Sequence, residues 1–196
     1  MSLPFSAAAE RNKVAIGDAL SSHFGAARHV LEIGSGTGQH AVYLAARFSH
    51  LQWQPTDRAE NLTAITQQIA ESDIDNVLPP LEVDVASNTV LSRQYNLAYS
   101  ANTAHIMSMA EVTAMFTLVS ATIHSGGCFA LYGPFSYGGE HTSDGNRNFH
   151  HMLQQQASHM GIRDKAVLDA IALDAGLDFT DDIAMPANNR ILIWQR

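Results

Sequence analysis

The chain has little of what disulfides, membrane spans and polyanion binding require. Cys128 is the only cysteine among 196 residues, so no disulfide can form within the chain. No apolar run approaches the ~18 residues of a membrane span, and residues 1–11 have neither the basic start nor the apolar core of a signal peptide. We therefore expect a cytoplasmic protein in which Cys128 is a buried structural thiol.

Basic residues are also scarce. The chain has 11 Lys and Arg against 19 Asp and Glu, which gives a net charge of −8, and no basic cluster occurs. Nucleic acids and anionic membranes are bound by clustered Lys and Arg, so we expect neither as a partner. Hydrophobic residues make up 46% of the sequence, which is typical of a globular protein. The length fits one domain over residues 1–196, and a small molecule is the expected partner.

Short apolar runs alternate with segments of helical spacing. Strands are expected at Arg28–Ile33, Leu51–Thr56, Leu81–Val85, Tyr95–Ser100 and Cys128–Tyr132. Helices are expected at Ala7–Phe24, Gln39–Phe48, Ala59–Ser72, Met109–His124 and Arg163–Ala175. Leu177–Met185 and Arg190–Gln195 are predicted as a terminal hairpin that adds an antiparallel strand at the far edge. The alternation predicts an α/β fold, a mostly parallel sheet with helices on both faces.

The first strand runs directly into a glycine-rich turn at residues 34–38. Glycines at the first, third and fifth positions let the backbone turn tightly and approach a ligand. A dinucleotide fingerprint would place its third glycine at position 39, where this chain has Gln39. Glu32, just before the turn, suits a cationic ligand and would repel a diphosphate. The turn therefore favours a cationic ligand over the diphosphate of NAD.

Polar side chains follow the next three strands, where doubly wound sheets bind ligands. Asp57 closes the second strand, about 20 residues after the turn, where an acid can accept hydrogen bonds from ribose hydroxyls. Asp84 closes the third strand, and its carboxylate could cap the segment that begins near Ala86. Asn102 and His105 follow the fourth strand. A histidine with its ordinary pKa of ~6.5 could accept a proton from a nucleophile, or could be hydrogen-bonded for structure alone.

The segment 134–160, after the fifth strand, is polar and is predicted to form a long excursion with a short helix. Its early residues would line a substrate pocket, and the segment would cover that pocket as a polar lid. His141, His150 and His151 suggest a metal at first sight, but adjacent histidines on a helix point in different directions. No closed Cys and His set accompanies them, so no metal is expected.

The pattern E-x-G-x-G-x-G at residues 32–38 resembles motif I of class I S-adenosylmethionine-dependent methyltransferases. The whole chain resembles the methyltransferase-like group labelled domain of unknown function 938. The matching segments are residues 8–12, 31–40, 53–57, 102–106, 131–135, 161–164 and 185–189. Family members often have Asn-Met where this chain has Asn102-Thr103, which affects the acceptor pocket and leaves the cofactor assignment intact.

The resemblance implies a Rossmann-like class I methyltransferase fold, with seven strands and an antiparallel C-terminal strand, that binds S-adenosylmethionine. It places Asp84 at the adenine amino group and the Val85 N–H at a ring nitrogen. The expected cofactor-binding residues are Glu32, Gly34, Ser35, Gly36, Thr37, Gly38, Asp57, Asp84, Val85 and Asn102. The expected catalytic residues are His105, Tyr132 and His141, and the expected substrate-binding residues are Arg11, Asn12 and Phe135.

Three functions are compatible with these residues. The first is a methyltransferase that acts on a small acceptor, which the sequence does not identify. The second is a non-catalytic protein that binds S-adenosylmethionine or a partner on the same scaffold. The third, an NAD-dependent oxidoreductase, is disfavoured by Glu32 and Gln39.

Overall fold

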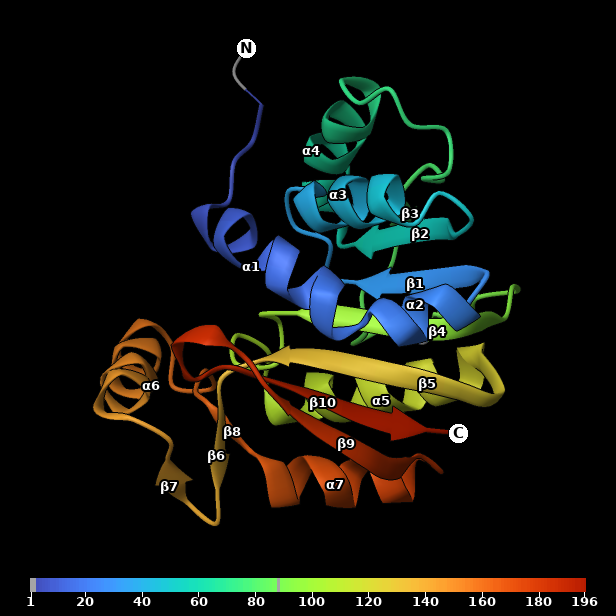
Figure 1. Cartoon of the computed structure of the whole chain (residues 1–196). Helices are drawn as coiled ribbons and strands as arrows, with labels where there is room; N and C mark the ends of the chain where they lie inside the picture. Colours follow the sequence, from blue (N-terminus) through green and yellow to red (C-terminus); the bar gives the residue numbers. More distant parts are fainter. Residues whose placement is uncertain (1–2, 88) are drawn as a thin grey trace.

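A twisted seven-stranded sheet forms the centre of the molecule (Figure 1). The structure is a computed structural model that describes residues 3–87 and 89–196. The strands lie in the order β3-β2-β1-β4-β5-β10-β9. Their bounds are β1 His29–Ile33, β2 Gln52–Asp57, β3 Leu81–Glu82, β4 Tyr95–Ala101, β5 Ile123–Gly133, β9 Asp178–Ala184 and β10 Arg190–Gln195. Strands β1 to β5 are parallel. From β1 the chain adds strands first on one side of the sheet and then, from β4 on, on the other side. Ligands of doubly wound sheets bind at the carboxyl ends of the two strands where this change occurs, here β1 and β4.

The antiparallel strand is not at the edge, as the sequence suggested, but one strand in from it. β10 pairs antiparallel with both β5 and β9, and β9 forms the edge. The burial of the two strands gives the reason. Four successive residues of β10 are buried, whereas most of β9 is exposed, so the apolar strand takes the interior position.

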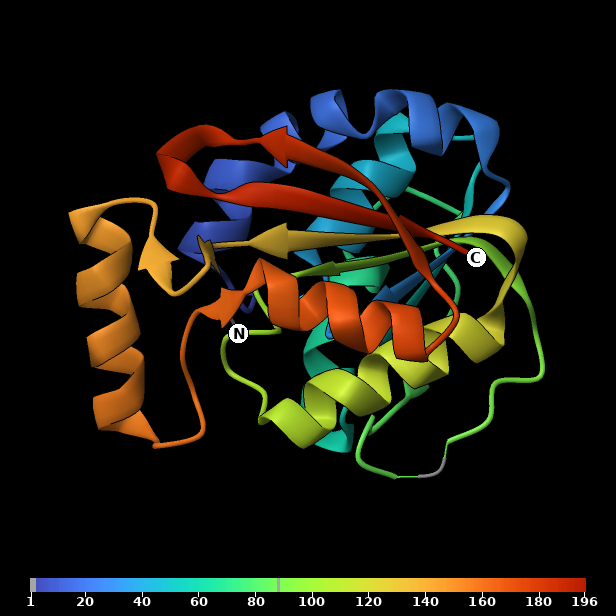
Figure 2. The ribbon, with the colours of Figure 1, turned by 90° about the horizontal axis from the view of Figure 1, so that it is seen from below.

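Helices cover both faces of the sheet (Figure 2). One core lies under α1, α2 and α3, and includes the buried aromatic rings of Phe24, Trp53 and Tyr99. The other lies under α5 and α7, and includes Phe116, Phe129 and Trp194. The helices are α1 Ala7–Ala19, α2 Ser21–Ala26, α3 Gln39–Arg47, α4 Ala59–Ala70, α5 Met109–Thr122, α6 Asp144–Gln156 and α7 Lys165–Asp174.

The N-terminal helix expected at Ala7–Phe24 is two helices. The chain leaves helical geometry at Leu20, whose ψ is 9°, and α2 begins at the next residue. Ile16, Leu20 and Phe24 are all fully buried in one core. The change of direction at Leu20 therefore lets both helices bury their apolar side chains against the sheet.

Three further segments differ from the sequence expectation. β3 has two residues rather than five, because it pairs with only the last two residues of β2 and the chain then turns at Asp84. β5 begins at Ile123 rather than at the expected Cys128, and its pairing with β4 is irregular near Tyr95 and Leu97. The polar segment after β5 contains the 13-residue helix α6 rather than the short helix expected from the sequence. With it lies a small sheet of β7 Glu140–His141, β6 Phe135–Tyr137 and β8 Arg163–Asp164.

None of the helices in residues 3–87 and 89–196 is long and apolar enough to cross a membrane.

Candidate functional site

The glycine-rich turn between β1 and α3 has the geometry that only glycine accepts readily. Gly34 and Gly36 have φ angles of 72° and 57°. A Cβ at Gly34 would lie 2.5 Å from Cγ2 of Thr103, whereas a Cβ at Gly36 would have no atom within 4 Å. Gly34 is therefore needed for packing, and Gly36 leaves open space beside the backbone that ligand atoms can occupy.

Asp57, at the end of β2, holds this turn in place. Its Oδ2 accepts a hydrogen bond from the Gly36 N–H at 2.7 Å, and its Oδ1 accepts from the Arg58 N–H and from Asn61 Nδ2, both at 2.8 Å. A carboxylate has about four lone-pair positions, of which three are thus used. One acceptor position on Oδ2 remains for a ligand hydroxyl.

Three cavities adjoin at this end of the sheet, and Asn102 lines all of them. The first, which we call the carboxylate cavity, has a volume of about 510 Å³ and is lined by Asp57, Asp84 and Glu111. The turn cavity, about 390 Å³, lies along the glycine-rich turn and the start of α1. The amide cavity, about 660 Å³, takes its name from Asn12, Asn102, Asn146 and Asn189.

Most of the predicted site residues line these cavities. Gly34, Gly36, Asp57, Asp84, Val85 and Asn102 line the carboxylate cavity. Gly34, Ser35, Gly36, Thr37 and Asn102 line the turn cavity. Arg11, Asn12, Asn102, His105 and Tyr132 line the amide cavity. Residues from six separate stretches of sequence thus meet at the carboxyl ends of β1, β2, β4 and β5, where doubly wound sheets bind ligands.

Asn102 is held at the junction by its backbone. Its N–H donates to the Tyr132 carbonyl at 2.9 Å, which ties the end of β4 to the end of β5. Its φ angle is 60°, a left-handed conformation that asparagine tolerates better than most residues.

Glu32 lies beneath the turn rather than in a cavity wall, so its position does not support the expected contact with a cationic ligand. Its side chain is buried, and its Oε2 accepts a hydrogen bond from Trp53 Nε1 at 2.9 Å. Burial, together with the nearby Asp57 carboxylate, raises its pKa to about 7 against the hydrogen bonds that lower it. Glu32 therefore supports the turn from the core.

Gln39, which occupies the position of the missing third glycine, anchors the N-terminal segment. Its Oε1 accepts from the Ser6 N–H at 2.5 Å and from Thr37 Oγ1 at 3.0 Å, and its Nε2 donates to Glu10 at 3.2 Å. One residue further on, the His40 ring bonds Asn12 Oδ1 at 2.7 Å. These contacts place α1 over the turn and its side chains beside the cavities.

His105 and Tyr132 share the amide cavity. Burial, with a smaller effect of the Arg163 charge, lowers the pKa of His105 to about 4, well below the ordinary value expected from the sequence. The ring is therefore neutral at pH 7. Arg163 anchors the loop that carries His105, because its Nε donates to the Ala104 carbonyl at 2.9 Å and its Nη2 donates to the Met107 carbonyl. Burial also raises the pKa of Tyr132, so its hydroxyl stays protonated.

Besides Glu32, three predicted residues lie outside the walls of these cavities. Phe135 is 1% exposed and belongs to the core under α5 and α7, so it does not face a substrate. His141 is in β7 and lies beside His150, with ring centroids 4.8 Å apart and the ring planes tilted by 49°, and it does not line the amide cavity. Gly38 begins α3 with a φ angle of 79° and packs against Ile65 of α4. The direction in which Phe135 and His141 point depends on how the short strands β6, β7 and β8 pair, and the sequence pattern does not reveal that pairing.

Asp84 forms the cap considered from the sequence, and its contact with adenine stays a prediction. Its Oδ1 accepts from the Ala86 N–H at 2.9 Å, which caps the following turn, and the residue also lines the carboxylate cavity.

The structure adds site residues that the sequence did not single out. Asn61 lies one helical turn after Asp57, bonds it, and lines two cavities. Asn146 and Phe149 of α6, and Asn189 between β9 and β10, line the amide cavity. The four-residue spacing between Asp57 and Asn61 could have indicated their contact. The predicted lid included Asn146 and Phe149, but it did not single them out. Asn189 lies in the segment 185–189 that resembles the family, but that resemblance gave it no role in the site.

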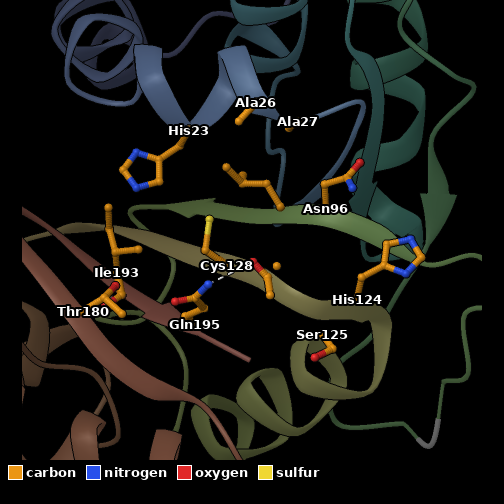
Figure 3. A pocket seen from close by; sticks show the side chains of 13 residues that line it. His23, Ala26, Ala27, Asn96, His124, Ser125, Cys128, Thr180, Ile193 and Gln195 are labelled. Carbon is orange, nitrogen blue, oxygen red and sulfur yellow. Dashed lines mark hydrogen bonds between the residues drawn. The ribbon is translucent and has the colours of Figure 1, made fainter.

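A fourth cavity, about 460 Å³, lies at the opposite end of the parallel strands (Figure 3). Cys128 points into it beside His23 and Gln195. The thiol is half-buried rather than buried, and burial raises its pKa to about 11, so it stays protonated at pH 7. In the described part of the chain, no three His, Cys, Asp or Glu side chains are grouped so that they could hold a metal ion.

Three solved structures that share this fold are described as methyltransferases. An O-methyltransferase family protein from Burkholderia thailandensis matches with a TM-score of 0.84 and 18% identity, over 96% of this chain and 57% of its own. Human N-acetylserotonin methyltransferase, solved in complex with S-adenosylmethionine, matches with a TM-score of 0.80 and 14% identity, over 96% and 52%. An O-methyltransferase family 2 protein from Planctomyces limnophilus, in complex with apigenin, has a TM-score of 0.75 and 12% identity, over 86% and 49%.

These matches establish the class of fold: an α/β sheet with the Rossmann-like topology of S-adenosylmethionine-dependent methyltransferases. The chain spans about half the length of these proteins. The chain belongs to the family described as protein of unknown function DUF938, whose model matches residues 3–196. The fold and the family predicted from the sequence are confirmed.

Proposed function

We propose that this protein is an S-adenosylmethionine-dependent methyltransferase with a small-molecule acceptor. The observation that carries the proposal is the meeting of the cavities at Asn102. A ligand bound along the turn that Asp57 holds would reach this residue from one side, and a molecule in the amide cavity would reach it from the other. The methyltransferases of the same fold support the assignment.

The residues present fit this cofactor. Open space beside Gly36 admits a ligand close to the backbone, and Asp57 keeps one acceptor position for a ribose hydroxyl. The carboxylate cavity bears Asp57, Asp84 and Glu111 against the single arginine Arg58. Excess negative charge favours a cationic ligand over a diphosphate. When bound, S-adenosylmethionine would supply a methyl group activated by its sulfonium.

The protein's own contribution would be alignment and proton acceptance. Methyl transfer is an in-line displacement, so holding the two reactants in one geometry accounts for much of the rate. Asn102 would position both at the junction. His105, neutral at pH 7, would accept the proton that the acceptor loses as the new bond to the methyl carbon forms. Because its ring is a weak base, it would serve an acceptor whose proton becomes acidic during the transfer.

Calorimetric titration with S-adenosylmethionine, and with NADH as the control ligand, tests the cofactor assignment. We expect binding of the first and none of the second. Asp57→Ala should remove most of the affinity, because both the ribose contact and the bond to Gly36 are lost. Asp73→Ala, which changes an exposed carboxylate remote from the cavities, should bind as the wild type does.

Failure of folded protein to bind S-adenosylmethionine would contradict the proposal. Binding without methyl transfer to any member of a metabolite panel would favour the non-catalytic alternative. Unchanged affinity of the Asp57→Ala variant would exclude the ribose contact.

A further inference from the structure

The cavities that adjoin at Asn102 differ in the sign of their charge. The carboxylate cavity bears three carboxylates and one arginine, Arg58. The amide cavity bears Arg11 and no carboxylate at all, in a chain whose net charge is −8. If the acidic cavity suits a cationic cofactor, the amide cavity is suited to a ligand of the opposite charge.

The helix around Arg11 is fixed in place, while Arg11 itself is exposed. Neighbouring residues of α1 are anchored to α3, since Asn12 bonds His40 and Glu10 bonds Gln39. Glu10, the nearest carboxylate in sequence, pairs with Lys13 at 2.7 Å. Within residues 3–87 and 89–196, Arg11 forms no salt bridge and its side chain forms no hydrogen bond. It is thus available for a ligand.

The opposite wall of the amide cavity is held by the turn between β9 and β10, which lies beside α6 (Figures 1 and 2). Asn146 Nδ2 donates to the Asn188 carbonyl at 3.1 Å and to Thr142 Oγ1 at 2.8 Å. In the turn, Ala187 and Asn188 have φ angles of 57° and 56°. Left-handed alanine is strained by about 1 kcal/mol or more. Strain held at a cavity wall is typical of binding sites, because surrounding contacts must maintain it.

Flat and apolar groups complete the lining. Phe149 packs edge to face with the His105 ring, with centroids 5.2 Å apart, and Tyr132, Pro134 and Pro186 lie around them. The volume, about 660 Å³, is within the range of small-molecule sites. Such walls fit a planar ring better than a flexible polar chain.

We propose that the methyl acceptor is a small aromatic carboxylate, and that Arg11 pairs with its carboxylate group inside the amide cavity. This inference depends on the proposed function, because it names the acceptor class of the same site. A guanidinium binds a planar carboxylate through two parallel hydrogen bonds. One arginine without further cations matches a monoanion better than a phosphate, which carries more charge. The group that receives the methyl would lie at the other end of the ring, towards Asn102 and His105.

The test uses matched probes on the full chain saturated with S-adenosylhomocysteine. Each hydroxybenzoate isomer is titrated beside the corresponding neutral hydroxybenzamide, and binding is followed by calorimetry. For at least one pair we expect the acid to bind the wild type about tenfold or more tightly than the amide. Arg11→Gln should remove that preference. Arg11→Lys should retain part of it, because charge remains while the paired geometry is lost.

Arg28→Gln is the matched control, since it removes the same charge from an exposed residue at the opposite end of the sheet. It should bind the acids as the wild type does. Equal binding of acid and amide in every pair would overturn the inference. So would an Arg11→Gln variant that binds acids normally but S-adenosylhomocysteine poorly, because Arg11 would then serve the cofactor. The affinity of the wild type for S-adenosylhomocysteine is measured separately in the same titrations. If the wild type does not bind S-adenosylhomocysteine, the proposed function itself is contradicted.

Discussion

Gly34 and Gly36 stand two residues apart in one turn and have similar backbone angles, yet their surroundings differ. A side chain at Gly34 would collide with Thr103, which cannot move aside easily because its hydroxyl lies 2.7 Å from Ser100 Oγ. Ser100 Oγ in turn donates to the Ile33 carbonyl at 2.6 Å. A side chain at Gly36 would enter open space where the cofactor is proposed to bind.

Substitution of each glycine by alanine should therefore separate folding from binding. Gly34→Ala should lower the free energy of unfolding by about 2–4 kcal/mol, because overpacking adds to the strain of a positive φ. Gly36→Ala should cost about 1 kcal/mol from strain alone, and should nevertheless lose most affinity for S-adenosylmethionine. Urea denaturation and calorimetry of both variants give the two quantities. Equal losses of stability would contradict the difference in packing, and unchanged affinity of Gly36→Ala would show that the open space at Gly36 has no functional meaning.

The site residues found from the sequence are those whose position follows from local pattern. The glycine-rich turn and Asp57 immediately follow apolar strands, so their place at the strand ends needs no tertiary information. Asn189 joins the site only because β10 inserts between β5 and β9. Phe135 was assigned to the substrate because it follows a strand end, but its ring turns into the core.

At the scale of whole elements, the buried strands were predicted best. Each end of β1, β2 and β4 lies within one residue of the expected range. The apolar run of β1 is typical of a buried parallel strand, whereas β2 reads Gln-Trp-Gln-Pro-Thr-Asp and is not a continuous apolar run. The small sheet of β6, β7 and β8 was missed, since its strands have two or three residues and one pairing joins β6 to the distant β8. Such strands form through long-range contacts and carry no periodicity of their own.

The N-terminus of α5 offers a test at the level of one helix. Ser108 and Glu111 form a capping box: the Glu111 N–H donates to Ser108 Oγ at 3.2 Å, and the Ser108 N–H donates to Glu111 Oε2 at 2.6 Å. Ser108→Ala should lower the free energy of unfolding by about 1 kcal/mol. Ser120→Ala, in the same helix and away from the cap, should change it by less than about 0.5 kcal/mol. Urea denaturation measures both, and a cap without energetic value would give equal results.

At the scale of the whole molecule, three buried groups make stability depend on pH, because each titrates differently in the folded and the unfolded chain. Burial raises the pKa of Glu32 from 4.5 to about 7. Burial, with a smaller effect of a nearby cation, lowers the pKa of His40 and of His105 from 6.5 to about 4. Each difference corresponds to about 3 kcal/mol between the limits of its range.

The signs of these contributions are opposite. As the pH falls from 6.5 towards 4, the unfolded chain gains protons on both histidines that the folded chain refuses, so stability is lost. As the pH rises from 4.5 towards 7, the unfolded chain loses the Glu32 proton that the folded chain keeps, so stability is lost in that direction. The two histidines outweigh the one carboxyl up to about pH 7, because each histidine of the unfolded chain is still half protonated at pH 6.5. Above that pH the remaining contributions nearly cancel, so stability levels off near pH 7.

Glu32→Gln tests this balance, because glutamine has nearly the same shape and does not titrate. Urea denaturation of the wild type between pH 4 and 8 should give a free energy of unfolding that rises up to about pH 7 and then levels off. The variant should rise about twice as steeply between about pH 4.5 and 6.5, since the opposing contribution of Glu32 is gone. Glu71→Gln, at an exposed position, should leave the wild-type curve unchanged in shape. An equally steep rise in the wild type and in the Glu32→Gln variant would mean that Glu32 is ionised in the folded protein at neutral pH. In that case the carboxylate would add to the negative charge beneath the turn, and the contact with a cationic ligand expected from the sequence would regain support.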